Sequence, residues 1–246
     1  MPPPPAHPFV QKTTSLGYHF LGLAYPDAPT VNAACTYTDR AGATDGDCFL
    51  HVRLARLSGG IYGGTAMHLP VTNVSQVDGG LSRLAVVLKQ AEAADKSWAQ
   101  YLVQAGLPQF TAPAGAAAAA QTVLPPTLPL PAPALAGVGS SDDGVAWRKV
   151  VLAGHSQGSG MALLLGKYKP VLRVVQLAGV DDVVQPAMVP APWVTGQSVT
   201  PPHLLFGLGN INGFACEASL TTLSRTPVRP RFSFSRVLVG FALCFC

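Results

Sequence analysis

The chain has 246 residues, of which 48% are apolar and only 11% are charged, against roughly 25% charged residues in an average soluble domain. This scarcity of charge excludes a charge-driven disordered protein and a coiled coil. The net charge of +4 comes from scattered basic residues, so we expect no nucleic-acid partner, and no apolar run is long enough to predict a membrane span.

The N-terminal part of the chain predicts irregular segments around one strand. Residues 1–16 are rich in proline and are expected to be irregular. Residues 18–26 form an apolar run that Pro26 stops, which is typical of a strand buried on both faces. Residues 27–72 contain many Gly, Asp and Thr residues and are expected to be loop-like.

The middle of the chain predicts one long helix and then a low-complexity segment. Apolar residues recur with a helical period over residues 76–105. Ser75, followed three residues later by Asp78, resembles a capping box that would start this helix. Residues 111–141 consist largely of Ala, Pro, Leu, Gly, Thr and Val and are interpreted as a low-complexity insert.

Regular structure is predicted again after this insert. The expected elements, strand, helix, strand and strand in that order, are 149–154, 157–168, 171–178 and 203–208. Apolar strands separated by helices or long connections are typical of a parallel sheet covered on both sides. The predicted fold class is therefore α/β, a mostly parallel sheet with helices on both faces.

The C-terminal residues 213–246 show neither a helical period nor a β–α unit, and the end Val237–Cys246 is a short apolar segment. We expect this irregular tail not to belong to the fold, for example because of an altered reading frame or a retained intron. The alternative is a real but divergent extension. The domain is then expected to comprise residues 17–212.

Five cysteines are present, and two of them flank a polar stretch that contains glycine. Cys35 and Cys48 lie where a loop-closing disulfide would fit, and the alternative is a pair of free thiols. A disulfide would indicate an oxidising compartment. The other three, Cys216, Cys244 and Cys246, lie in the tail and are given no framework role.

The segment that carries chemistry is Gly154-His155-Ser156-Gln157-Gly158, which fits the pattern G-x-S-x-G. An apolar strand leads into it and a helix-like segment follows. Such a tight turn strains the backbone at Ser156 and projects its hydroxyl above the edge of the sheet. The backbone N–H of Gln157 then points to where an oxyanion would form. The alternative is an ordinary tight β–α turn.

This segment resembles the nucleophile elbow of the α/β-hydrolase superfamily. Residues 17–26, the strand Arg173–Gly179 with Asp181, and Ala191-Pro192-Trp193 are similar to a little-characterised branch of secreted serine hydrolases. The resemblance covers roughly residues 17–105 and 142–210, and it implies a Cys pair after the early strand and a sheet that lacks its first and last strands.

The resemblance implies a triad in the order serine, acid, histidine. Asp181 follows a strand at the expected catalytic edge and is the candidate acid, with a loop or capping role as its alternative. His203 is the only histidine after the elbow. It opens a strand, which favours a structural role at the opposite edge over that of the base. No glycine-rich loop for a second oxyanion donor precedes Tyr18.

The expected function is that of a serine hydrolase acting on a small-molecule ester or related acyl substrate, with no metal or organic cofactor. Ser156 is the nucleophile, Gln157 the oxyanion donor, and Asp181 and His203 are the candidate partners. The alternatives are a catalytically silent binding protein and a non-functional fragment. The residues after Met1 show no signal peptide, whereas the family and the cysteine pair suggest secretion, so localisation stays open.

Overall fold

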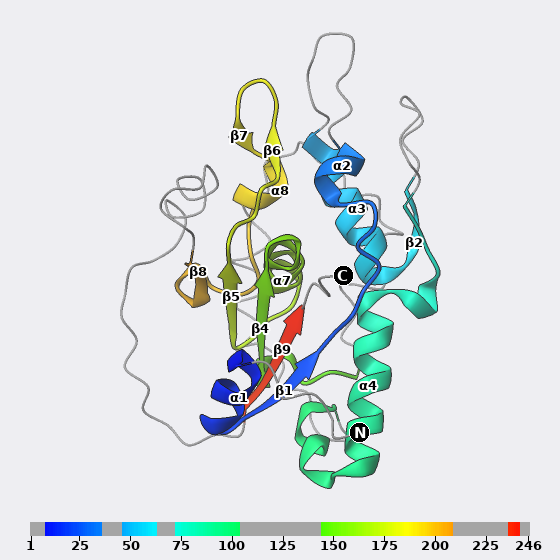
Figure 1. Cartoon of the computed structure of the whole chain (residues 1–246), viewed down its shortest axis with the longest axis vertical. Helices are drawn as coiled ribbons and strands as arrows, with labels where there is room; N and C mark the ends of the chain where they lie inside the picture. Colours follow the sequence, from blue (N-terminus) through cyan, green and yellow to red (C-terminus); the bar gives the residue numbers. More distant parts are fainter. Residues whose placement is uncertain (1–7, 36–45, 63–71, 104–143, 209–235, 242–246) are drawn as a thin grey trace, which may run out of the picture.

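The structure is a computed structural model that describes residues 8–35, 46–62, 72–103, 144–208 and 236–241 (Figure 1). Its α-helices are α1 (Pro8–Ser15), α2 (Val31–Cys35), α3 (Gly46–Ser58), α4 (Gly80–Ala94), α7 (Gln157–Tyr168) and α8 (Pro192–Thr195). Its 3-10 turns are η1 (Gln76–Asp78), η2 (Lys96–Tyr101), η4 (Trp147–Lys149) and η5 (Pro202–Leu204). The insert at 111–141 and Cys216, Cys244 and Cys246 lie outside the described residues.

The main sheet has five strands in the order β1-β9-β4-β5-β8, and each neighbouring pair is parallel. The strands are β1 (Tyr18–Gly22), β9 (Arg236–Phe241), β4 (Val150–His155), β5 (Arg173–Leu177) and β8 (Leu205–Leu208). Two antiparallel ribbons accompany this sheet, β2 (Gly60–Tyr62) with β3 (Thr72–Val74) and β6 (Val183–Val184) with β7 (Val189–Pro190). The α/β class and the parallel sheet are as the sequence predicts.

Helices cover both faces of this sheet because side chains of a strand point alternately to opposite faces. Val150 and Leu152 of β4 belong to the large core cluster that also contains buried residues of α3, α4 and α7. Val151 and Ala153 belong to a second cluster, against which Phe20 packs. The ring of Phe9 in α1 contacts Phe20, so α1 lies on this second face.

The expectation that residues 213–246 lie outside the fold is wrong for β9. Its backbone pairs with β1 on one side and with β4 on the other, with Val239 opposite both Leu21 and Leu152. The segment Val237-Leu238-Val239 is apolar and contains two β-branched valines, which is typical of an interior strand of a parallel sheet. Without a β–α unit before it, only pairing with distant strands identifies it.

Two further expectations are corrected at the N-terminal side. Residues 8–15 form α1, although 1–16 were expected to be irregular; Pro8 is its first residue, where a missing N–H costs no hydrogen bond. Part of the expected loop 27–72 forms the helix α3. Its buried residues lie on nearly all sides and include Arg53 and Arg56, which hides the usual amphipathic period.

The predicted helix over 76–105 is divided into three pieces. Ser75 caps the first, η1, by accepting a hydrogen bond from the Asp78 N–H at 3.3 Å. The long helix α4 starts only at Gly80, and Asp95 caps the following turn η2. The capping pair that the sequence identifies therefore starts a 3-10 turn rather than the α-helix.

Burial of Lys167 is expected to make the stability of the fold depend on pH. Its side chain is buried at the end of α7, where Nζ donates to the Gly196 carbonyl, and burial lowers its pKa from 10.5 to about 8. Between these pH values the unfolded chain binds more protons than the folded chain, so stability rises with pH.

We expect the free energy of unfolding of wild type, measured relative to that of Lys167→Met, to rise by roughly 2 kcal/mol between about pH 7 and about pH 10. Urea denaturation at both pH values measures this gain. Lys96→Met, at an exposed lysine, is the control and should show little such change. A difference between wild type and Lys167→Met that stays constant with pH would contradict the assignment.

Candidate active site

Ser156 lies at the turn between β4 and α7 with a left-handed backbone, φ 52° and ψ −123°. A non-glycine residue with such angles is strained and persists only where its surroundings hold it. Its N–H donates to the carbonyl of Leu177 at the end of β5, at 2.9 Å. A Cβ at Gly154 would lie 2.0 Å from the Gly158 carbonyl oxygen, so this glycine is required for the close turn.

A buried hydroxyl holds the same turn from the inside of the fold. Ser159 Oγ lies 2.8 Å from the Gly154 carbonyl oxygen and 2.7 Å from that of Leu177, and it accepts from the Leu177 N–H at 3.2 Å. Ser159 is completely buried. It therefore joins the first turn of α7 to the ends of β4 and β5 and helps to hold Ser156 in its strained conformation.

The first turn of α7 faces the space above Ser156. Gln157 is the first residue of this helix, whose N-terminal end carries a partial positive charge and N–H groups without helical partners. Within the part of the chain that the structure describes, the Ser156 side chain forms no hydrogen bond. The serine hydroxyl is thus placed beside N–H groups that can stabilise a negatively charged oxygen.

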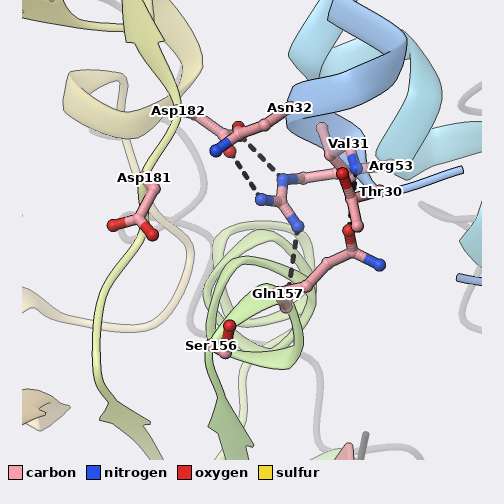
Figure 2. A pocket seen from close by; sticks show the side chains of 8 residues that line it. All are labelled: Thr30, Val31, Asn32, Arg53, Ser156, Gln157, Asp181 and Asp182. Carbon is pink, nitrogen blue, oxygen red and sulfur yellow. Dashed lines mark hydrogen bonds and ion pairs between the residues drawn. The ribbon is translucent and has the colours of Figure 1, made fainter.

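A cavity of about 160 Å³ opens at this point (Figure 2). Its lining residues are Thr30, Val31, Asn32, Arg53, Ser156, Gln157, Asp181 and Asp182. It lies at the carboxyl ends of the parallel strands, where ligands bind in open α/β sheets. The structure therefore brings together three predicted residues, Ser156, Gln157 and Asp181, with others that the sequence did not suggest.

The loop after β1 forms one wall of the cavity, and sequence analysis missed it. Gln157 holds this loop with its side-chain amide: Oε1 accepts from the Val31 N–H at 2.7 Å, and Nε2 donates to the Asp27 carbonyl at 3.1 Å. Arg56 of α3 donates to the Pro29 carbonyl from the other side. The only signal in the sequence is that this loop follows the carboxyl end of a predicted strand.

The two neighbouring aspartates have different surroundings. Asp181 lines the cavity, and partial burial together with the nearby negative charge of Asp182 raises its pKa, although Arg53 opposes this. Asp182 is almost fully buried and accepts hydrogen bonds from Arg53 and from the Trp193 indole. Asp182 is thus held within the fold, whereas Asp181 is exposed at the cavity.

His203 is misplaced as a base, and this candidate is corrected. It lies in η5, before β8, whose Leu205 pairs with Val174 at the start of β5. Ser156 follows the carboxyl end of β4, which lies next to β5 in the sheet. The length of this six-residue strand, roughly 20 Å, therefore separates His203 from Ser156. No imidazole lines the described cavity.

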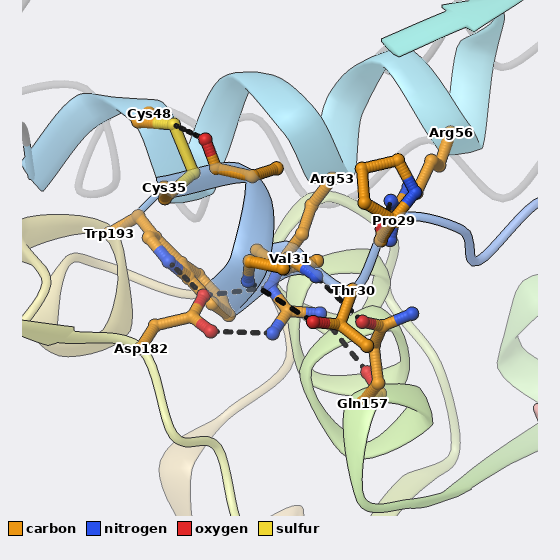
Figure 3. The surroundings of a disulfide bond; sticks show 12 residues. Pro29, Thr30, Val31, Cys35, Cys48, Arg53, Arg56, Gln157, Asp182 and Trp193 are labelled. Atoms are coloured by element: carbon orange, nitrogen blue, oxygen red, sulfur yellow. Dashed lines mark hydrogen bonds and ion pairs between the residues drawn. A yellow bond between two sulfur atoms is a disulfide. The ribbon is translucent and has the colours of Figure 1, made fainter. Parts of the chain in front are cut away.

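Cys35 and Cys48, the pair that the sequence singles out, are bonded to each other (Figure 3). The bond joins the end of α2 to the start of α3, and both residues are 1% exposed. The disulfide therefore connects the helix that begins in the cavity wall to the helix that carries Arg53.

Neither a cluster of metal-ligating side chains nor a membrane-spanning helix is found in the described part of the chain. The described residues contain no group of three or more His, Cys, Asp or Glu side chains that could hold a metal ion. In the same part of the chain, no helix is both long enough and apolar enough to span a bilayer.

Comparison with protein-family models, with curated proteins and with solved structures finds no match to this chain. The geometry of the cavity is therefore the basis for the function proposed below.

Proposed function

We propose that the protein is a serine hydrolase that cleaves an ester or a related acyl bond through Ser156. The observation that carries this proposal is the left-handed backbone of Ser156 at a strand-to-helix turn that opens into a cavity. Strain of this kind is concentrated at functional sites. An ordinary β–α turn would need neither a serine with a strained backbone nor the close approach of Gly154 to the first turn of the helix.

In the proposed reaction, Ser156 Oγ attacks the acyl carbon and the carbonyl electrons move to the oxygen. The Gln157 N–H stabilises that oxyanion at the positive end of α7. The carbonyl reforms as the C–O bond to the alcohol breaks, and the proton released by Oγ is transferred to the leaving oxygen. Water then hydrolyses the acyl-enzyme, which releases the acid and returns the proton to Ser156 Oγ. Asp181 is proposed as the acidic member of the catalytic group. The lining of the described cavity contains no imidazole that could act as its partner base.

The small size of the cavity favours a short acyl group. The cavity has a volume of about 160 Å³. Val31 is the one aliphatic residue of its lining among the described residues. A long alkyl chain would extend beyond a space of this size and leave apolar surface in water. We therefore infer acetyl to butyryl groups as the acyl moiety.

Hydrolysis of p-nitrophenyl esters tests this proposal. We expect the acetate and butyrate to be cleaved with a kcat/KM at least about tenfold above that of the decanoate. Ser156→Ala should lose nearly all of this activity, by a factor on the order of 10⁴ or more. Ser82→Ala, a serine on α4, is the matched control and should keep it. Equal activity of wild type and Ser156→Ala would reject the hydrolase.

A second candidate function is a catalytically silent binding protein, and the lack of an imidazole in the described cavity favours it. In that case the cavity would hold a small polar ligand without turnover. No ester in the series would then be hydrolysed faster by wild type than by Ser156→Ala.

A further inference from the structure

Arg53 is a buried cation whose hydrogen-bond donors are directed at specific atoms. It is 2% exposed, and it meets Asp182 through two hydrogen bonds, Nε to Oδ2 at 2.7 Å and Nη2 to Oδ1 at 2.6 Å. The Trp193 indole donates to the same carboxylate at 2.9 Å, and the guanidinium lies 5.5 Å from the centre of that ring. Such a bidentate pair fixes the orientation of the guanidinium plane.

The remaining contacts of Arg53 are with the first turns of α7. Its Nη1 donates to the Gln157 carbonyl at 3.0 Å. A Cβ at Gly160 would lie 2.2 Å from the guanidinium carbon, so the absence of a side chain there lets the guanidinium lie against the helix. Figure 2 shows Arg53 above the start of α7, next to the cavity.

This contact acts on the residue that carries the proposed oxyanion donor. The carbonyl belongs to the peptide between Gln157 and Gly158, and the proposed oxyanion donor N–H belongs to the preceding peptide. Fixing the carbonyl therefore holds the first residue of α7 in place and restricts how its N–H can turn. Arg56, one turn further along α3, holds the loop on the other wall through Pro29. The helix α3 therefore connects both walls of the cavity, and Arg53 is its link to the elbow.

We propose that Arg53 is a positioning residue for the reaction at Ser156: fixed by Asp182 and Trp193, it holds the first residue of α7, Gln157, in the position from which its N–H can stabilise the oxyanion. This proposal rests on the proposed function. It assigns to α3 a role in catalysis, although Arg53 forms no bond to substrate. A lysine retains the charge but lacks the planar fork that reaches Asp182 and Gln157 together.

The test compares Arg53→Lys with Arg83→Lys, whose arginine forms an exposed pair with Asp78. For p-nitrophenyl acetate, we expect Arg53→Lys to lower kcat on the order of 100-fold while KM changes less than about threefold. Arg83→Lys should leave both unchanged. Circular dichroism during heating measures the folded fraction, so that kcat is expressed per folded molecule.

If Arg53→Lys does not fold, Asp182→Asn supplies the second variant. It keeps an acceptor for Arg53 but removes the charge that orients the guanidinium, and a fall in kcat with little change in KM is expected. A folded variant of either kind with wild-type kcat would overturn the positioning role, as would a loss that appears only in KM. Absence of Ser156-dependent hydrolysis in wild type would instead reject the proposed function.

Discussion

Replacing Asp182 by alanine is expected to lower the free energy of unfolding by about 3–5 kcal/mol. The carboxylate is 1% exposed and is the partner of two Arg53 nitrogens and of the Trp193 indole. Its removal leaves a guanidinium charge buried with no counterion, and the cost of that desolvation exceeds the loss of the hydrogen bonds themselves. Urea denaturation monitored by circular dichroism measures the effect.

Two comparison variants make this prediction specific to the buried pair. Asp78→Ala removes the acid of an exposed pair with Arg83 and should have a much smaller effect. Adding Arg53→Met to Asp182→Ala removes the unpaired charge and should restore part of the lost stability. Equal losses for Asp78→Ala and Asp182→Ala, or no recovery in the double variant, would show that Arg53 is not held as a buried ion pair.

Gly154→Ala is expected to prevent the elbow from closing. The added Cβ would lie 2.0 Å from the Gly158 carbonyl oxygen and 2.3 Å from its carbon. These are backbone atoms, so no rotation of a side chain relieves the overlap, and β4 must move away from α7. We expect a loss of stability of roughly 3 kcal/mol or more, with loss of hydrolysis in any folded fraction.

Gly22→Ala is the matched control for this change. Gly22 also lies at the end of a strand of the main sheet, but its added Cβ would be 3.7 Å from a ring carbon of Phe20, an ordinary contact. Its melting temperature should therefore stay near that of wild type. If Gly154→Ala melts like Gly22→Ala and keeps wild-type activity, the close contact between β4 and α7 is not a requirement of the site.

The parts of the fold that could be predicted from sequence are those with a local signal. An apolar run, a glycine-flanked serine and a helical segment follow one another in β4 and α7, so neighbouring residues determine the unit. The same holds for β5 and β8. The cavity residues that belong to this part of the chain, Ser156, Gln157 and Asp181, were therefore identified in advance.

The parts that could not be predicted depend on distant partners. β9 is recognisable as a strand only by its pairing with β1 and β4. Arg53 belongs to a helix that was expected to be loop, and its counterion is 129 residues away in the chain. Burial of an arginine contradicts its usual exposure, and no local pattern predicts which carboxylate will compensate its charge.

The central claim, that Ser156 is an activated nucleophile, is tested most directly by covalent labelling with a fluorophosphonate under native conditions. Phosphorus bonds to Oγ and fluoride leaves, so intact mass and peptide mass spectrometry locate the adduct. We expect a single adduct on Ser156 in wild type and in Ser82→Ala, and none in Ser156→Ala. An unlabelled wild-type protein, or equal labelling of Ser156→Ala, would contradict the account.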